Sequence, residues 1–451
     1  MALPLATDRA RCILFAPPDS APDGPAAVRT SALFGLQLVE RTVLAFLRAG
    51  VRDFAVTGDP GAAAWVVSVL SGGRCQRARV RLAGARESLL LLVERDEACF
   101  VARTDSLYDR RLVMRFVDET ATAAATVAAV DFRADALLAQ EGAPRIAGWR
   151  AGGEGSGDRL RVAGQGLMAP EGVLTGLARV TPSFARVLED APPEYRSIEN
   201  ALTLLARREP VATWAVAELW QAVRPSGHLR DDDLALAHRK VLAGAVGVSD
   251  GLVARRLNRP LSRRITERIV SRDVKPWQLS VASFLATLCA GASFAMGHAT
   301  TGGLVAQMAS ILDGVDGQVA RIRYQDSPFG DVYDALLDRV GDAVLIGGMT
   351  LYAWLMGAGH SAVALGFGAM AGSSLSMLVK EKYGTQFRRP YRTDREGRWG
   401  WLLLGRDGRL FLTLLAGVTG YVEAVLAYLA VGTHLHAGVR LYRIRSEATA
   451  G

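Results

Sequence analysis

Short apolar runs and amphipathic stretches alternate through residues 1–240, and none of these runs is long enough to cross a membrane. Such alternation is typical of an open α/β sheet whose strands are connected by helices. We therefore predict an α/β domain over residues 1–240, with a Gly-rich surface loop at 151–157. The expected strands are residues 11–16, 52–58, 88–93 and 98–102, and the expected helices are residues 35–50 and 60–70.

The second half of the chain has a different pattern, because it contains long stretches with almost no charge. About 20 apolar residues suffice to span a bilayer as a helix. A turn near residues 357–360 would divide the longest of these stretches into two spans, and weaker spans lie at 299–320 and from residue 400. We therefore predict an all-α, six-helix transmembrane domain over 276–445. The uncharged stretches are 276–297, 343–379 and 410–439, the last interrupted only by Glu423.

Positive charge is divided unequally between the predicted loops. The loops near 298–303, 357–361 and 418–422 contain no Lys or Arg, whereas the opposite loops and the C-terminal tail contain many. An excess of Lys and Arg marks the cytoplasmic loops of membrane proteins. The sequence therefore predicts an integral protein of the cell membrane whose N-terminal domain and C-terminus are cytoplasmic.

A basic segment joins the two halves. Between residues 250 and 273, seven arginines accompany apolar residues at helical spacing. A helix of this composition lies in the membrane interface, with its arginines near anionic head groups. We predict a basic interfacial helix and linker over residues 241–275; a solvated linker is the alternative.

Composition narrows the protein class further. Half of the residues are hydrophobic, which excludes a disordered or fibrous chain. The net charge is +8. A basic balance suits nucleic acid, anionic lipid or phosphorylated substrates. Because the arginines gather beside the predicted spans, we expect membrane lipids and phosphates as partners and no nucleic acid. The four cysteines show no metal-ligand or disulfide-scaffold spacing, and the N-terminal residues do not resemble a cleavable signal peptide.

Four aspartates on two neighbouring predicted helices are the strongest candidates for chemistry. Asp313 and Asp316 are three residues apart, and Asp334 and Asp338 are four apart, so each pair shares a helix face. A short connection lets the two helices pack antiparallel, which would gather the carboxylates near the cytoplasmic boundary of the membrane. Oxygen-preferring divalent cations relieve the resulting repulsion, and Mg²⁺ or Mn²⁺ fits best. A solvated cluster at two helix ends is the alternative.

Residues beside these aspartates indicate the kind of ligand. Gly314 and Gly317 leave the backbone open for close approach of a ligand, and Arg321 can bind a phosphate. Carboxylates, metal, glycine and arginine together describe a diphosphate site. One carboxylate must also stay free to accept a proton from an attacking hydroxyl.

The same stretch reads D-x2-D-G-x2-A-R-x8-G-x3-D-x3-D and resembles the signature of the CDP-alcohol phosphotransferases, also called CDP-alcohol phosphatidyltransferases. The resemblance covers about residues 250–445 and implies attack of an alcohol on a CDP-linked donor, with release of CMP. It also implies metal ligation by Asp313, Asp316, Asp334 and Asp338, with Asp338 as the base. The residues it implies for substrate binding are Gly317, Ala320, Arg321 and Gly330.

The resemblance departs from the family at the start of the first span. Many members have a Pro-Asn-x-x-Thr-like stretch there, and Trp277 and Ser280 replace the Asn and the Thr. The contacts to cytidine are therefore undefined, while the aspartates of the metal site are all present. We predict that Arg388, Arg389 and Arg392 bind an acceptor phosphate or anionic lipid.

The partners of this domain are a CDP-linked donor and an alcohol acceptor. A CDP-diacylglycerol donor would give a phospholipid, and a soluble CDP-inositol would give a phosphodiester. Both remain open, as does a homodimer. The alternative from another class is a membrane-tethered binding or regulatory protein in which the carboxylates are only structural.

The N-terminal half resembles sugar-nucleotide transferases at residues 35–58 and at 104–108, where Asp105 matches their metal-binding aspartate. Such a domain is fused to a CDP-alcohol phosphotransferase in the inositol-phosphate cytidylyltransferase/di-myo-inositol-phosphate-phosphate synthase proteins. Here residues 16–24 lack the Gly-rich, Arg-containing phosphate loop, and Ala222 stands at a later metal position. We predict a nucleotidyltransferase-like, Rossmann-type domain that is degenerate, non-catalytic or regulatory. The alternative is a bifunctional enzyme that also makes its own CDP-activated donor.

Overall fold

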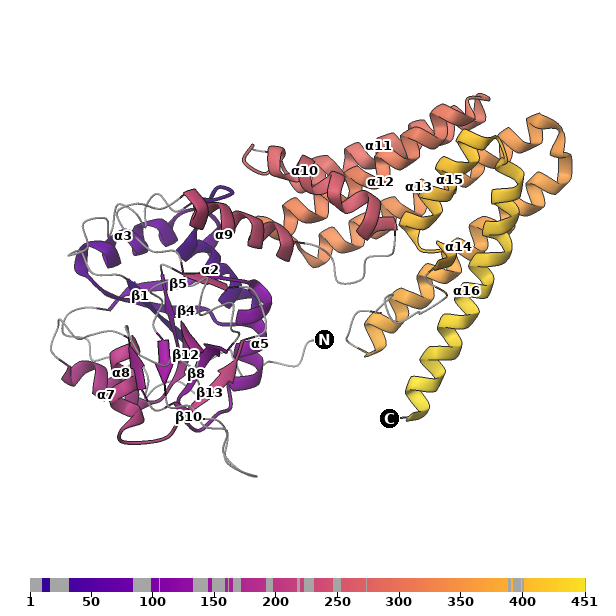
Figure 1. Ribbon diagram of the computed structural model, residues 1–451. Helices are drawn as coiled ribbons and strands as arrows, with labels where there is room; N and C mark the ends of the chain where they lie inside the picture. Colours follow the sequence, from indigo (N-terminus) through magenta and orange to yellow (C-terminus); the bar gives the residue numbers. More distant parts are fainter. Residues whose placement is uncertain are drawn as a thin grey trace. The chain divides into compact units, whose positions relative to one another are not determined.

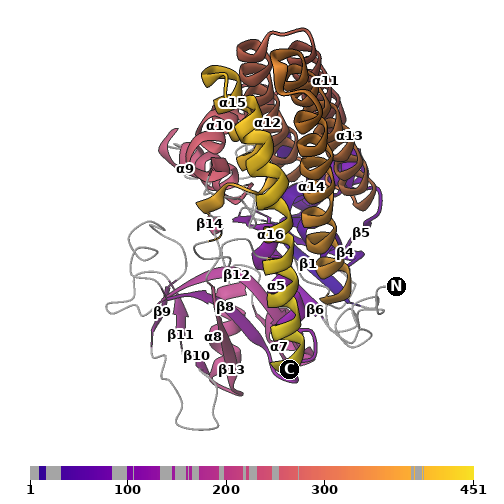
Figure 2. The same ribbon diagram turned by 90° about the vertical axis from the view of Figure 1, so that its right-hand side faces the viewer.

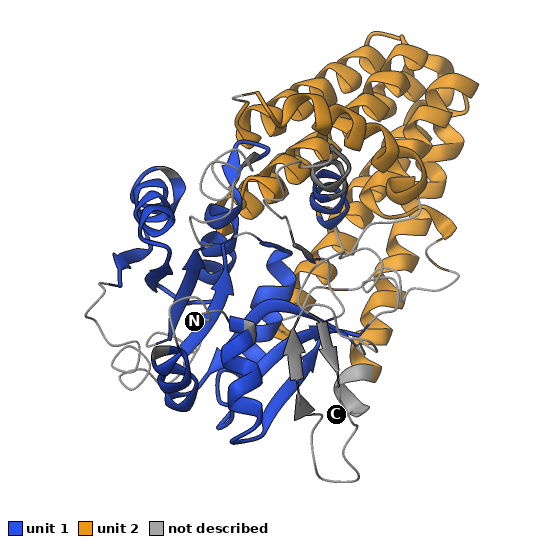
Figure 3. Ribbon diagram, turned by 60° about the vertical axis from the view of Figure 1, so that its left-hand side comes forward, with its two compact units in different colours: residues 1–244 blue, residues 245–451 orange. Residues whose placement is uncertain are grey.

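A computed structural model of the chain divides into two compact units, Met1–Gly244 (unit 1) and Ala245–Gly451 (unit 2), which Figure 3 shows in blue and orange. The structural statements below concern the residues that this structure describes. They are residues 10–16, 32–83, 99–104, 106–132, 145–147, 159–160, 162–164, 172–191, 198–216, 220–222, 231–245, 253–272, 274–387, 391, 399 and 401–450.

Unit 1 is built on one mixed sheet, for which ten strands are described (Figures 1 and 2). They are β1 (Arg11–Ala16), β4 (Asp53–Gly58), β5 (Arg79–Leu82), β6 (Cys99–Arg103), β8 (Val127–Asp131), β9 (Arg145–Ala147), β10 (Arg159–Leu160), β11 (Val162–Gly164), β12 (Gly172–Val180) and β13 (Val211–Ala215). The main path runs β10-β13-β8-β12-β6-β1-β4-β5. Strand β1 is parallel to β4 and β6, whereas β12 is antiparallel to β6 and β8. The prediction of an α/β sheet in this half is confirmed.

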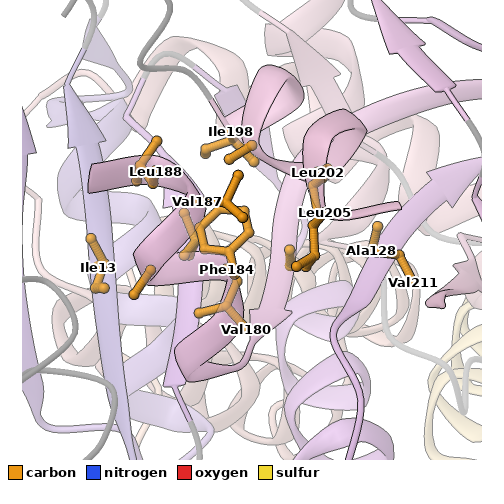
Figure 4. Close-up of a cluster of buried hydrophobic side chains, with 14 of the residues drawn as sticks. Ile13, Ala128, Val180, Phe184, Val187, Leu188, Ile198, Leu202, Leu205 and Val211 are labelled. Atoms are coloured by element: carbon orange, nitrogen blue, oxygen red, sulfur yellow. The ribbon is translucent and has the colours of Figure 1, made fainter. Parts of the chain in front are cut away.

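The core of unit 1 consists of large apolar side chains between this sheet and its helices. Figure 4 shows Phe184 among its neighbours, with Leu202 and Leu205 close by, and all three are at most 1% exposed. Burial of such side chains removes apolar area from water and stabilises the fold by about 1.5–3 kcal/mol for each fully buried residue. The helices of unit 1 are α2 (Leu38–Arg48), α3 (Pro60–Ser71), α5 (Arg110–Thr120), α7 (Pro182–Asp190), α8 (Ile198–Ala206) and α9 (Asp231–Gly244).

Most local predictions for unit 1 agree with the structure. The predicted strands at 11–16, 52–58 and 98–102 are β1, β4 and β6, and the helix at 60–70 is α3. The helix predicted at 35–50 begins only at Leu38, so its start was wrong. The preceding residues instead form a small hairpin, in which β2 (Ala32–Leu33) pairs with β3 (Leu36–Gln37) around Gly35 at a φ of 76°. The strand predicted at 88–93 and the loop at 151–157 lie outside the described residues.

Unit 2 is helical throughout its described residues. Its helices are α10 (Arg259–Ile269), α11 (Pro276–Ala295), α12 (Ala299–Ile322), α13 (Pro328–Ala353), α14 (Gly359–Phe387), α15 (Arg406–Thr419) and α16 (Val422–Ala450), with π-helical turns η3 (Ala254–Asn258) and η4 (Trp354–Ala358). Helices α14 and α16 run side by side in both ribbon views (Figures 1 and 2).

Three stretches of the described chain are long and apolar enough to cross a membrane: Pro276–Ala295, Pro328–Phe387 and Val422–Ser446. The second stretch contains both α13 and α14. Gly357, at a φ of 103°, interrupts the helical backbone between these two helices. Helices α12 and α15 occupy the positions of the two weaker predicted spans. Six crossings therefore remain a prediction, while a membrane region in unit 2 is supported by these three stretches.

The helices of unit 2 pack closely because small residues stand at their contacts. A Cβ atom added to Gly348 of α13 would lie 2.1 Å from the carbonyl oxygen of Gly291 in α11, and one added to Gly417 of α15 would lie 2.3 Å from that of Ala299 in α12. Small residues of this kind let backbones approach, as is typical of helices in membranes. These contacts bring α11, α12, α13 and α15 together around the aspartates.

Candidate active site

The four motif aspartates come from two adjoining helices of unit 2. Asp313 and Asp316 lie on α12, and Asp334 and Asp338 lie on α13. Three of them border one small cavity that is partly open to solvent and offers about 10 Å³ of room for water-sized molecules. The residues lining this cavity are Ser280, Ser283, Phe284, Thr287, Asp313, Asp334, Leu337, Asp338 and Arg406.

Asp316 stands apart from the lining but is tied to it by a hydrogen bond. Its side chain is only 5% exposed, and the hydroxyl of Ser280 donates to its Oδ2 atom at 2.7 Å. The backbone N–H of Gly317 donates to its Oδ1 atom at 2.5 Å. Ser280 is the residue that replaces the expected Thr of the first span, so the substitution keeps the hydroxyl that holds Asp316.

Arg406, the first residue of α15, forms ion pairs with two of the aspartates. Its Nη1 atom lies 2.5 Å from Oδ2 of Asp313, and its Nη2 atom lies 2.7 Å from Oδ1 of Asp338. The guanidinium thus stands between the carboxylates of α12 and α13. Among the described residues, no three acidic, imidazole or thiol side chains are arranged to hold a metal ion in this structure.

A second ion pair continues the contact between α13 and α15 one turn further along. Arg409 Nη2 lies 2.5 Å from Oδ2 of Asp342, and the hydroxyl of Ser373 donates to the same oxygen at 3.1 Å. Arg409 is 4% exposed. Asp338 and Asp342 are one helical turn apart on α13, and Arg406 and Arg409 are nearly one turn apart on α15, so the two pairs form successive steps.

The donor set tests whether a hard divalent cation fits the cluster. Asp313, Asp334 and Asp338 present carboxylate oxygens to the cavity, and Ser280 adds a hydroxyl. Oxygen ligands of this kind suit Mg²⁺ and Mn²⁺. The negative charge of the cluster exceeds the single positive charge that Arg406 supplies. The donor types and the charge of the cluster therefore fit a divalent cation, while their arrangement around Arg406 forms no three-ligand metal site in this structure.

The other predicted site residues lie outside the cavity lining. Arg321 donates from Nε to the carbonyl oxygen of Ala245 at 2.6 Å, and a Cβ atom added to Gly317 would lie 3.2 Å from its Nη2 atom. Ala320 lies half-buried in the last turns of α12. Gly330 belongs to the first turn of α13, where its N–H donates to the capping hydroxyl of Ser327 at 3.0 Å. Arg388, Arg389 and Arg392 lie outside the described residues.

The predicted basic interfacial segment contains η3 and α10, and its polar face is bonded to α12. Thr266 donates to Gln318 at 2.9 Å, and Gln318 donates to Ser262 at 2.8 Å. Asn258 donates to Ser310 at 2.9 Å. These contacts argue against a solvated linker, and arginines such as Arg263 and Arg264 remain exposed on the opposite side of α10.

In unit 1 the structure brings together the two segments that resemble a nucleotidyltransferase metal site. Strand β7 (Ser106–Tyr108) pairs antiparallel with β14 (Trp220–Ala222), and Ala222 is the register partner of Ser106. The residue at the expected metal position therefore adjoins the segment that follows Asp105. Asp105 itself and residues 17–24 of the altered phosphate loop lie outside the described residues.

The sequence analysis did not identify Arg406, Arg409 or Asp342 as candidate site residues. Ionisable residues beside a membrane span are usually functional, and that signal was available for all three. Which helix they contact could not be deduced from spacing along one helix. Ser280 was identified as a departure from the family pattern, but its bond to Asp316 was not foreseen.

Comparison with known proteins connects this geometry to a family. Residues 274–434 match the family described as CDP-alcohol phosphatidyltransferase. This chain carries a CDP-alcohol phosphatidyltransferase domain. The domain contains α11 to α15, the four aspartates and Arg406, and the family resemblance predicted from the aspartate motif is confirmed.

Relatives of this CDP-alcohol phosphatidyltransferase-containing chain include proteins named "Bifunctional IPC transferase and DIPP synthase". The one from Aquifex aeolicus is 28% identical over 63% of this chain and 64% of its own length. The one from Rubrobacter xylanophilus is 37% identical over 43% of this chain and 42% of its own length. The chain thus spans less than two thirds of either relative. "Archaetidylinositol phosphate synthase" of Methanothermobacter thermautotrophicus is 34% identical over 20% of this chain and 48% of its own length.

Among solved structures, the chain resembles the inositol-1-phosphate CTP transferase from T. maritima. The two share 14% sequence identity at a TM-score of 0.38, and the match covers 51% of this chain and 96% of that chain.

Proposed function

We propose that the protein is an integral membrane transferase that moves a substituted phosphate from a CDP-linked donor to an alcohol acceptor and releases CMP. The observation that carries this proposal is the gathering of Asp313, Asp334 and Asp338 around one cavity inside a CDP-alcohol phosphatidyltransferase domain. A binding protein with purely structural carboxylates is the competing function, and metal-dependent release of CMP separates the two.

In this proposal the four aspartates have different tasks. Asp313, Asp316 and Asp334 would hold Mg²⁺ or Mn²⁺, with Asp338 at the margin of the same cluster. When bound, the cations polarise the donor diphosphate and stabilise the CMP leaving group. Ser280 keeps the buried carboxylate of Asp316 oriented toward the cluster through its 2.7 Å hydrogen bond.

The chemical step needs a base for the acceptor. The acceptor oxygen attacks the phosphorus that carries the donor's alcohol group, and the bond from that phosphorus to the CMP oxygen breaks. The hydroxyl proton passes to a carboxylate oxygen of Asp338. We assign this task to Asp338 because a carboxylate at the edge of the cluster can keep one oxygen free for a hydroxyl within hydrogen-bond reach.

The substrate contacts follow the motif. We place Gly317, Ala320, Arg321 and Gly330 on the donor side, and Arg388, Arg389 and Arg392 at an acceptor phosphate or lipid head group. The distribution of Lys and Arg supports a cytoplasmic position for the site, for unit 1 and for the C-terminus. The exposed arginines of α10 suit anionic head groups at the same membrane face.

Relatives narrow the choice of acceptor to test first. Inositol appears in the name of "Archaetidylinositol phosphate synthase", while "Bifunctional IPC transferase and DIPP synthase" names a different product. We therefore propose inositol or an inositol phosphate as the first acceptor to test. Paired assays with CDP-diacylglycerol and with CDP-inositol distinguish phospholipid synthesis from phosphodiester synthesis.

The decisive test is CMP release by the purified full-length protein with Mg²⁺ or Mn²⁺. Asp313→Asn should weaken donor binding and abolish turnover, whereas Asp338→Asn should keep donor binding and lower turnover by about 10²–10⁴-fold. Asp331→Asn is the matched control, because Asp331 is an exposed aspartate outside the motif on α13, the helix that carries Asp338. Normal turnover in Asp313→Asn would remove the metal assignment, and equal loss of donor affinity in both motif variants would make Asp338 a ligand instead of the base.

Unit 1 is proposed to be a degenerate nucleotidyltransferase-like domain. The pairing of β7 with β14, with Ala222 in place of an aspartate, supports this view. Removal of residues 1–240 should leave CMP release measurable, and isolated unit 1 should release little diphosphate from CTP and a polyol phosphate. Rapid diphosphate release would favour the bifunctional alternative, in which unit 1 supplies the CDP-activated donor.

A further inference from the structure

Arg406 stands where a helix disfavours a cation. It is the first residue of α15, and the N-terminus of a helix carries a partial positive charge from the peptide dipoles. Its side chain is nevertheless held in the aspartate cluster, where Asp313 and Asp338 bind its two terminal nitrogens, and only 17% of this side chain is exposed. The carboxylates, and not the helix, therefore hold this cation in place.

The guanidinium only partly satisfies its own hydrogen-bonding groups. The Nε atom of Arg406 is buried and has no hydrogen-bond partner among the described residues. A buried donor left in this way costs about 1–3 kcal/mol. Asp313, one of its two partners, keeps a side-chain exposure of 31%. The arrangement offsets only part of the negative charge of the cluster, and it leaves one donor of Arg406 unused and one carboxylate accessible.

The start of α15 is anchored on both sides of Arg406. Asp407 accepts hydrogen bonds from Asn258 and Ser310, each at 3.3 Å, and Arg409 is paired with Asp342 at 2.5 Å. The backbone at residue 406 therefore stays beside the cavity when the flexible side chain leaves the carboxylates. A tethered group at a high effective concentration competes persistently with a free ligand for the same partners.

The size of the cavity agrees with an occupied site. With Arg406 in its lining, the cavity offers about 10 Å³ of room for water-sized molecules, which is about what a single water molecule needs. Withdrawal of the guanidinium would both free two carboxylates and enlarge the space beside them.

We propose that Arg406 is a tethered counter-ion, which offsets part of the negative charge of the aspartate cluster in the metal-free protein and is exchanged for the divalent cation. The inference rests on the proposed function, because it takes the cluster as the cation site. It makes Arg406 a positioning residue that sets the apparent metal affinity. If the guanidinium occupies the cluster for nine-tenths of the time, the apparent dissociation constant rises by about 10-fold.

The test is a Mn²⁺ titration of chelator-treated, full-length protein in detergent, with free Mn²⁺ followed by electron paramagnetic resonance. Arg406→Met should bind Mn²⁺ about 10-fold more tightly than the wild type. Its midpoint of thermal unfolding should be lower than that of the wild type without metal, and saturating Mn²⁺ should narrow the difference. Arg339→Gln is the control, because Arg339 follows Asp338 directly on α13 but pairs with Glu381, outside the cluster. This control should change Mn²⁺ affinity by less than about twofold, since loss of a nearby charge without loss of the tether has only a weak effect.

Each outcome decides between defined alternatives. Equal or weaker Mn²⁺ binding by Arg406→Met, with binding retained by the wild type, would overturn the counter-ion role and leave the proposed function intact. Equal tightening in Arg339→Gln would overturn it as well, because general electrostatics would then explain the gain. If Arg406→Met does not fold, Arg406→Lys replaces it in the titration. A lysine side chain cannot bridge two carboxylates as a guanidinium does, so the Arg406→Lys protein should still bind Mn²⁺ more tightly than the wild type. Absence of Mn²⁺ binding in every protein, the wild type included, would overturn the metal site and the proposed function together.

Discussion

The interiors of the two units are built from different residues. Unit 1 buries large side chains such as Phe184 and Leu202 between a sheet and its helices. Unit 2 buries small residues at close helix contacts. It also buries ionic side chains such as Arg409 and Asp316 and hydroxyl side chains such as Ser310. The hydrophobic effect rewards the first arrangement in water. Lipid is as apolar as a leucine side chain, so helices in a bilayer associate through close backbone contact and polar bonds instead.

This difference explains why a cluster of four aspartates can lie within unit 2. Polar groups are already part of its interior, and several are bonded across helices, as Thr266 is to Gln318. Adding four aspartates to such an interior needs counter-charge and a few hydroxyl partners, but no separate pocket in an apolar core. In unit 1 the same charges would interrupt the apolar core itself.

The largest expected effect comes from a methyl group at the closest helix contact. Gly348→Ala should prevent α11 and α13 from packing, because the new Cβ atom would lie 2.1 Å from the Gly291 carbonyl oxygen. We expect loss of monodisperse protein in size-exclusion chromatography. Gly347→Ala is the matched control, since a Cβ atom there meets nothing within 4 Å and alanine favours a helix. Similar behaviour of both variants would show that close contact does not hold unit 2 together.

The next effect tests the buried ion pair of unit 2. Asp342→Asn leaves the guanidinium of Arg409 buried without its counter-charge and should destabilise the protein by about 3–5 kcal/mol. Thermal unfolding in detergent measures the change. Arg339→Gln breaks a pair whose acidic partner, Glu381, is 51% exposed, and should cost less than about 1 kcal/mol. A small loss in Asp342→Asn would mean that solvent or lipid reaches this pair.

A truncation in unit 1 should act through cavity formation instead. Leu202→Ala removes a side chain that is 1% exposed and should destabilise unit 1 by about 2–5 kcal/mol. Leu204, two residues away on α8, is 37% exposed, and Leu204→Ala should change stability by less than about 0.5 kcal/mol. Denaturant unfolding of unit 1 distinguishes the two, while CMP release by the full-length protein should be unchanged in both. Loss of CMP release with Leu202→Ala would show that the units are coupled.

The smallest expected effect concerns one hydroxyl in unit 2. Ser280→Ala removes the donor to Asp316 and should cost about 1–2 kcal/mol, with a measurable loss of Mn²⁺ affinity because Asp316 loses its orientation. Ser280→Thr should restore both properties, since it keeps the hydroxyl. In Ser293→Ala the lost hydroxyl bonds only to the carbonyl oxygen of Cys289 in its own helix, so stability and Mn²⁺ affinity should hold. An unaltered Ser280→Ala variant would remove Ser280 from the site.

Local patterns predicted much of the fold. Charge-free length indicated α11, α13, α14 and α16, and the alternation of short elements indicated the α/β sheet of unit 1. The start of α2 was missed, because the residues before Leu38 have helical periodicity yet pair as a short hairpin. The mixed strand order of the sheet could not be predicted either, since pairing between β12 and β6 depends on distant parts of the chain.

The same limit applies to the candidate site. Spacing placed the aspartates on shared helix faces, because residues three or four apart are neighbours on a helix. The partners of Asp313 and Asp338 come from α15, which begins almost 70 residues after Asp338 in the sequence. No periodicity within one helix carries that information. The contact depends on glycines such as Gly303 and Gly417, which set how closely α12 and α15 approach.

The first turn of α15 carries three charged residues that bind partners on α12 and α13: Arg406, Asp407 and Arg409. Each residue advances an α-helix by about 100°. Loss or gain of a single residue between positions 406 and 409 would therefore rotate the later side chains away from their partners all at once, an error that no single substitution could repair. Among related chains that share this site, differences in length are accordingly expected before residue 405 and never within this turn. The four-residue segment can thus serve as a fixed reference point when distant sequences are aligned.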